Sequence, residues 1–252
     1  MKSIFTYALL LTLSYAHEPI QEQPIEAELI PQQMLASDPY LTGSSQDNFV
    51  AQQKELISGK LLNLWGVGLF AGTDLFSSAI RVVTSSDISH VGIILADENG
   101  TKYSYESTGS ASDILVKHVL PQVQIHLWDD VINNYNGKIW QRQFTFTEPE
   151  RNDPAVISPY VLGRIGMPYE KSIIDLISAV TRGNTEGTPD SVFCSEETAR
   201  FLLTLKYLDS ERLPDNYLPK DFSSKEFIPL IGCSLGKQTQ VKLNKSGCCT
   251  II

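Results

Sequence analysis

A cysteine near the three-quarter point of the chain has the setting of a nucleophile. Cys194 lies in the stretch Ser-Val-Phe-Cys-Ser-Glu-Glu-Thr, which predicts a helix whose first turn contains the cysteine. The face of Cys194 continues at Thr198, Phe201, Leu202 and Leu205, so the thiol points inward. The free N–H groups and the dipole at a helix N-terminus favour a thiolate, and they can also stabilise an oxyanion.

A histidine and a glutamate about a hundred residues earlier can activate such a thiol. Residues 89–96 form a β-branched run typical of a central strand, and residues 102–106 alternate as its hairpin partner. We expect Asn99-Gly100 to form a type I′ turn between them. His90 then begins one strand and Glu106 lies near the far end of the other, as cross-strand neighbours. A carboxylate in that position can orient the imidazole toward a thiol.

Each of these residues also has an ordinary structural interpretation. Cys194 can be a small buried apolar residue, His90 a core histidine and Glu106 a surface carboxylate. His118 and His126 are rival bases, but both alternate with apolar residues in predicted strands, so we rank them below His90. The combination of a cysteine that opens a helix with a histidine and a glutamate on strands favours nucleophilic chemistry.

Five short segments, with the histidine before the cysteine, resemble a known superfamily. They are Asp74-Leu-Phe-Ser-Ser-Ala-Ile-Arg, Thr84-Ser-Ser-Asp-Ile-Ser-His-Val-Gly-Ile, Tyr105-Glu-Ser, Gly166-Met-Pro-Tyr-Glu and Phe193-Cys-Ser-Glu. In this order they resemble the circularly permuted papain-like (NlpC-type) superfamily, specifically its YiiX/YaeF-like amidase group, over about residues 65 to 222. The resemblance implies an α+β fold in which an antiparallel sheet packs against helices, with the cysteine at a helix N-terminus. The chain departs from the family at Gly72-Thr-Asp74, where a Gly-Asp pair is usual.

The resemblance also implies roles for individual residues. Cys194 is the nucleophile, His90 the general base and Glu106 the residue that orients His90. Tyr169 follows Gly-Met-Pro, where relatives carry a tyrosine near the oxyanion, and a core aromatic is the equal alternative. Glu196 matches the family's Cys-Ser-Glu, or it acts only electrostatically on the helix N-terminus.

The function that this resemblance implies is hydrolysis of an amide bond through an acyl-enzyme, with no cofactor and no metal. The expected substrate is a small amide, a lipid or a peptide. A net charge of −9 without a basic patch mildly favours a small amide or lipid over a polyanionic cell wall. The alternatives are a lipid acyltransferase or thioesterase, and a non-catalytic secreted binding or anchoring protein on the same fold.

Composition limits the other possibilities. A chain of 252 residues with 42% hydrophobic residues can bury one full-sized core. The acidic balance, 29 Asp and Glu against 20 Lys and Arg, excludes nucleic acid as an expected partner. The four cysteines, at 194, 233, 248 and 249, form no paired CxxC motif, so no metal site is predicted. No apolar run approaches the roughly 20 residues of a membrane-spanning helix.

The two ends of the chain differ in character from its middle. Residues 1–16 have the form of a signal peptide, with Lys2, an apolar run and Ser14-Tyr-Ala before His17. The chain is therefore expected to be secreted, or periplasmic if the host is bacterial. Residues 17–50 are interpreted as a polar linker or arm, 51–230 as the permuted papain-like domain, and 231–252 as a cysteine-containing tail.

The last four residues, Cys249-Thr-Ile-Ile, have the form of a prenylation site, and Cys248 beside them is a candidate for palmitoylation. Prenyl transferases are cytosolic, whereas a signal peptide removes the chain from the cytosol. We therefore favour cysteines that are oxidised, paired with Cys233 or with another chain, or simply frayed. Membrane attachment through Cys248 and Cys249 is the less favoured alternative.

Overall fold

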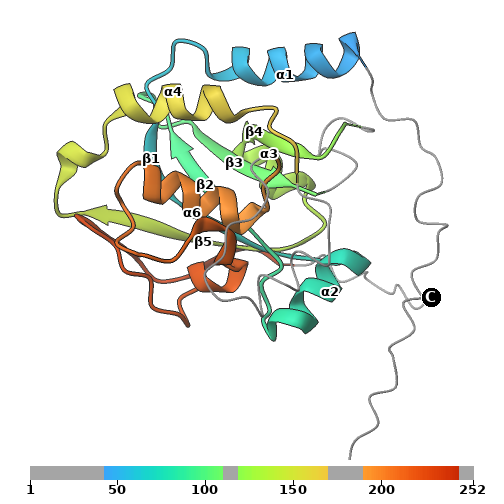
Figure 1. Ribbon diagram of the computed structural model, residues 1–252, viewed down its shortest axis with the longest axis vertical. Coiled ribbons are helices and arrows are strands. Elements are labelled where there is room, and N and C mark those ends of the chain that lie inside the picture. Colours follow the sequence, from blue (N-terminus) through green and yellow to red (C-terminus); the bar gives the residue numbers. More distant parts are fainter. Residues whose placement is uncertain (1–42, 110–118, 170–189, 244–252) are drawn as a thin grey trace, which may run out of the picture. The chain divides into compact units, whose positions relative to one another are not determined.

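An antiparallel sheet packed against helices forms the part of the chain that the computed structural model describes, residues 43–109, 119–169 and 190–243 (Figure 1). The helices are α1 (Ser44–Ile57), α2 (Leu75–Thr84), α3 (Trp128–Asn134), α4 (Pro154–Arg164) and α6 (Cys194–Thr204), with short 3-10 turns η2 (Pro149–Arg151), η3 (Pro214–Asn216) and η4 (Pro219–Phe222). The strands are β1 (Asn63–Gly72), β2 (His90–Ala96), β3 (Lys102–Thr108), β4 (Gln122–Leu127), β5 (Gly137–Phe146), β6 (Cys233–Leu235) and β7 (Thr239–Lys242). The predicted α+β class with an antiparallel sheet is confirmed.

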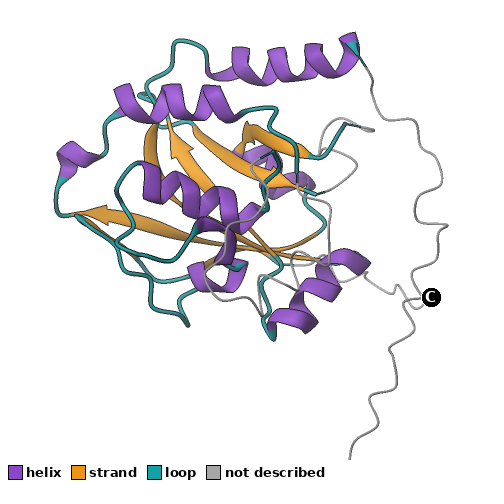
Figure 2. Ribbon diagram, viewed as in Figure 1, coloured by secondary structure: helices purple, strands orange, loops and turns teal. Residues whose placement is uncertain are grey.

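The strand order is β4-β3-β2-β1-β5-β6, and β7 also pairs with β5. Residues of α1, α4 and α6 share the larger core with one face of the sheet, and α3 packs on the other face (Figure 2). Val91 and Ile93 of β2 belong to the first core, whereas Ile94 packs with Trp128 in the second. Successive side chains of a strand point to opposite faces, so a central strand covered on both faces is apolar along its length. None of the described helices combines the length and apolarity needed to cross a bilayer.

Helix α6 begins at Cys194, as the sequence predicts, and it lies across β2 and β3. Its first residues are buried, and Phe201 and Leu202 continue the buried face. The backbone N–H of Phe193 donates to Glu196 Oε2 (3.2 Å), which fixes the chain as it enters the helix. The core thus holds the first turn of α6, and with it Cys194, against the sheet.

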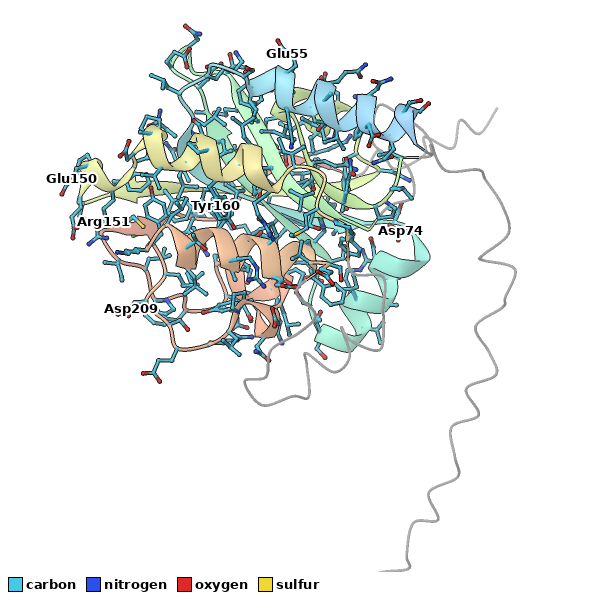
Figure 3. The ribbon with its side chains drawn as sticks, turned by 45° about the horizontal axis from the view of Figure 1, so that its top comes forward. Glu55, Asp74, Glu150, Arg151, Tyr160 and Asp209 are labelled. Carbon is cyan, nitrogen blue, oxygen red and sulfur yellow. The ribbon has the colours of Figure 1, made fainter. Side chains whose placement is uncertain are left out.

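The buried carboxylate of Glu197 joins α6 to α4 and β3. It accepts hydrogen bonds from Tyr105 Oη (2.5 Å) and Tyr160 Oη (3.2 Å), and it pairs with the Arg164 guanidinium. Figure 3 labels Tyr160 on α4, whose hydroxyl reaches α6. Glu197 is 1% exposed, so loss of Arg164 would leave a buried unpaired charge and cost about 3–5 kcal/mol. This network fixes the helix that carries Cys194.

Asp74 is the N-cap of α2, because Asp74 Oδ1 accepts the Ser77 N–H (2.8 Å) and the Ser77 hydroxyl donates to Asp74 Oδ2 (2.7 Å). The turn between β2 and β3 is not type I′, because Gly100 has positive φ (81°) and Asn99 does not. The Asp97 carboxylate accepts the N–H groups of Asn99 (3.0 Å) and Thr101 (2.9 Å), which favours a longer turn.

The described elements extend past both predicted boundaries of the domain. The arm was expected to end at residue 50, but α1 begins at Ser44 and buries Phe49, Gln53 and Ile57 against the sheet. The domain was expected to end at residue 230, but β6 and β7 extend the sheet by pairing with β5. Both segments are polar in sequence, and their structure depends on distant strands. The predicted signal peptide 1–16, residues 17–42 of the predicted arm, and Cys248 and Cys249 lie outside the described residues.

Candidate active site

His90 and Glu106 lie on the same face of neighbouring strands and share a hydrogen bond. Ile94 of β2 is paired with Ser104 of β3, and this register continued places His90 diagonally across from Glu106. Their bond joins His90 Nε2 to Glu106 Oε2. Gly92 lies between them, and a Cβ there would come within 2.9 Å of the Glu106 Cβ. The absence of a side chain at Gly92 therefore makes room for Glu106 to reach the imidazole.

Cys194 meets the same imidazole from the N-terminus of α6. The charge of Cys194 raises the pKa of His90, so the thiol lies within electrostatic reach of the imidazole. On its other side the ring is held by the bond from Nε2 to Glu106. Cys194 is buried, with 4% of its surface exposed. The structure thus brings together all three residues of the predicted triad, from three different elements.

The electrostatics of the three groups favour a protonated imidazole. Burial alone would lower the pKa of His90, but a negative charge on Cys194 and the Glu106 carboxylate together raise this pKa from 6.5 to about 10. Burial likewise tends to raise the pKa of Glu106, yet the hydrogen bond and charge of His90, with help from His126 and Ser104, hold it below its usual value. At neutral pH the imidazolium therefore lies between a carboxylate and a sulfur.

A cavity of about 510 Å³ opens beside this cluster. His90 and Glu106 line it together with Asp74 at the start of α2, Tyr135 after α3, and Tyr169. Asp74 is labelled in Figure 3 at that end of α2. Cys194 is not among the described residues that line the cavity, and it belongs to the larger core. Of the three triad residues, His90 and Glu106 are therefore the two that face the cavity.

Tyr169 forms part of the cavity wall next to the entrance of α6. It is 5% exposed and packs edge-on against Phe193, with ring centroids 5.8 Å apart. Its backbone N–H donates to Pro121 O (3.0 Å), which ties the tyrosine to the start of β4. Tyr169 is thus a core aromatic that also faces the cavity. Its role near an oxyanion stays a prediction.

Two residues of β4, Gln124 and His126, line the cavity, although neither of them was assigned to the site from the sequence. His126, ranked as a weaker rival base, is buried on the cavity wall, and its Nε2 lies 3.0 Å from Gln124 Oε1. Gln124 pairs with Glu106 across the strands and lines the same cavity. The signal in the sequence is Gln122-Val-Gln-Ile-His, a polar face of period two on a buried strand. The other rival, His118, lies outside the described residues.

Glu196 points away from the imidazole. It pairs with Arg200 (2.6 Å) and accepts the Phe193 N–H, so it acts on the N-terminus of α6. Burial, followed by the neighbouring Asp215 carboxylate, raises the pKa of Glu196 to about 7, although Arg200 opposes this shift. These contacts match the second predicted role of Glu196, which is to act on the N-terminus of its own helix.

No family model matches the chain, and no curated protein matches it in sequence. The fold is similar to the crystal structure of the metalloprotein YiiX from Escherichia coli O157:H7, with 17% identity and a TM-score of 0.40. The match covers 72% of this chain and 97% of the YiiX chain. In the part of the present chain that is described, no three His, Cys, Asp or Glu side chains come together as a metal site requires.

Proposed function

We propose that the protein is a cysteine hydrolase that cleaves an amide bond through an acyl-enzyme, on a permuted papain-like fold. The observation that carries this proposal is the position of His90, which is hydrogen-bonded to Glu106 and lies within electrostatic reach of Cys194 at the N-terminus of α6. A buried thiol beside a half-buried imidazole and carboxylate is the constellation that a thiol nucleophile needs.

The reaction follows from the geometry in two steps. The Cys194 sulfur attacks the carbonyl carbon, and the imidazolium of His90 donates its proton to the departing amine as the C–N bond breaks. A water molecule then gives a proton to His90 and attacks the thioester, which releases the acid and restores the thiolate beside the imidazolium. Glu106 holds the ring through Nε2 during both steps. The first backbone N–H groups of α6, which have no acceptor within the helix, can donate to the oxyanion.

The burial of Cys194 favours one alternative, a non-catalytic protein that binds a ligand in the cavity. Thiol reactivity separates the two. We expect iodoacetamide to modify Cys194 at least about 100-fold faster than Cys233 at pH 7. Cys233 is also buried and free, and burial raises its pKa to about 11. Peptide mapping by mass spectrometry reads each cysteine separately.

The matched controls for this labelling are Cys233→Ser, which should leave the rate at Cys194 unchanged, and His90→Ala, which should slow it. Equal rates at Cys194 and Cys233 would contradict an activated thiol and favour the binding protein. A lipid acyltransferase or a thioesterase would use the same acyl-enzyme. Mass spectrometry of the product identifies an acyltransferase, because only hydrolysis gives the free acid, and comparison of an amide with the matching thioester as substrate identifies a thioesterase.

The proposed substrate is a small amide, a lipid or a peptide, and the proposed location is outside the cytosol. Residues 1–16 are proposed to be removed, which would leave His17 as the first residue. N-terminal sequencing of protein purified from its native host tests this proposal. A chain that retains Met1 there would show that the segment is not a cleaved signal peptide.

A further inference from the structure

A second cavity, of about 450 Å³, adjoins the first and shares Tyr169 with it. We call it the α1 groove. Its lining includes apolar side chains from three segments, Val50, Leu120, Pro121, Ile165 and Pro168. The proposed reaction does not use this groove.

The α1 groove contains a buried hydrogen-bond donor without an acceptor in the described part of the chain. The Leu120 N–H donates to Gln46 Oε1 (3.2 Å), and this bond fixes the Gln46 amide so that its Nε2 donates to Gln122 Oε1 (2.7 Å). The Nε2 group of Gln122 therefore has no acceptor among the described residues, although Gln122 is only 3% exposed. Buried amide donors without a partner are rare in folded proteins, and a bound acceptor would satisfy this one.

Gln124 repeats the arrangement two residues further along β4, in the first cavity. Its Oε1 is engaged by His126, and its Nε2 has no acceptor among the described residues, although Gln124 is only 1% exposed. Positions i and i+2 of a strand share a face and lie roughly 6.6 Å apart. Carbonyl oxygens on one side of an extended peptide repeat at the same distance. The two amides therefore match two carbonyls of such a chain.

We propose that Gln122 and Gln124 each donate a hydrogen bond to a carbonyl oxygen of a peptide-type substrate that lies extended beside β4, with an apolar side chain in the α1 groove. The inference rests on the proposed function and names its substrate class. A simple fatty amide has one carbonyl and would leave one of the two buried amides unpaired, whereas a peptide satisfies both. A peptide substrate differs from the small amide or lipid that the net charge of −9 mildly favours.

The test uses binding rather than turnover, in the full chain carrying Cys194→Ala. The probe is acetyl-leucyl-alanyl-alanine amide, compared by calorimetry with two analogues in which one peptide bond is replaced by an (E)-alkene. Each alkene keeps the shape of the peptide but lacks one carbonyl oxygen together with the N–H group of the same peptide bond. We expect the parent peptide to bind about tenfold more tightly than at least one analogue, which corresponds to one hydrogen bond. Gln122→Leu should abolish that difference for the analogue that lacks the carbonyl facing Gln122 and leave the Kd of that analogue unchanged, and Gln124→Leu should do the same for the analogue that lacks the carbonyl facing Gln124.

The unchanged Kd of that analogue shows that the groove is intact in the variant. If Gln122→Leu does not fold, Gln122→Glu, which keeps the shape but removes the donor, should weaken the parent peptide and leave the analogue that lacks the carbonyl facing Gln122 unchanged. Equal affinities of the peptide and both analogues, or no measurable binding of any of them, would overturn the inference. Loss of hydrolysis with the binding difference retained would instead overturn the proposed function.

Discussion

Replacing Cys194 with alanine should lower amide turnover by at least about 10³-fold, and replacing His90 with alanine should do the same. A nucleophile and its base act as a unit, so the loss of either removes most of the chemistry, and the double variant should be no worse than either single one. The measurement is turnover of a panel of N-acyl amino acids, muropeptides and thioesters by the wild type and the three variants.

Folding should survive these changes. Cys194 is a small residue, so alanine removes only one sulfur atom from the core, and His90 lies at the start of β2 rather than at its centre. Circular dichroism and thermal unfolding serve as the control. Turnover close to that of the wild type in a folded Cys194→Ala or His90→Ala variant would show that the triad assignment is wrong.

Replacing Glu106 should lower turnover less, by about 10²-fold for alanine and by a smaller factor for glutamine. Orientation and charge are partial contributions, and the glutamine oxygen can still accept a hydrogen bond from the ring. The pKa of His90, now about 10, should fall in both variants, because one of its two anionic partners is lost. An NMR titration of the imidazole measures this pKa directly.

The free energy of unfolding should change with pH as His90 titrates. The folded pKa of His90 lies above its ordinary value of 6.5, so the protonated ring stabilises the folded state. This contribution is complete below pH 6.5 and is lost as the pH rises through about 10. In Glu106→Ala the loss should begin at lower pH, as urea unfolding at a series of pH values would show.

A charge-matched control for the Glu106 variants is Glu55→Gln on the exposed side of α1 (Figure 3). It removes one negative charge from a different part of the fold and should leave the His90 titration unchanged. Superimposable His90 titration curves in the wild type, Glu106→Gln and Glu106→Ala would remove Glu106 from the site and leave a Cys-His dyad.

The sequence by itself was sufficient for the parts of the site that depend on neighbours along the chain. The start of α6 at Cys194 follows from helical spacing, and the pairing of the His90 strand with the Glu106 strand follows from a short hairpin. Both patterns involve residues within about 20 positions of one another, so local periodicity defines them. The hairpin survives the wrong turn type, because the Asp97 side chain closes a different turn and still leaves Ala96 paired with Lys102.

Tertiary structure alone decided which groups meet from distant segments. Cys194 reaches His90 across about a hundred residues, through the packing of α6 on β2 and β3. The side-chain nitrogens of Gln122 and Gln124 have no acceptor among the described residues, because Gln46 and His126 occupy the oxygens of the two amides. No local pattern specifies these contacts, since they depend on how α1 and the strands pack together. For the same reason the sequence predicts an arm and a tail where the structure has α1, β6 and β7. These segments are polar, and their structure depends on the sheet against which they pack.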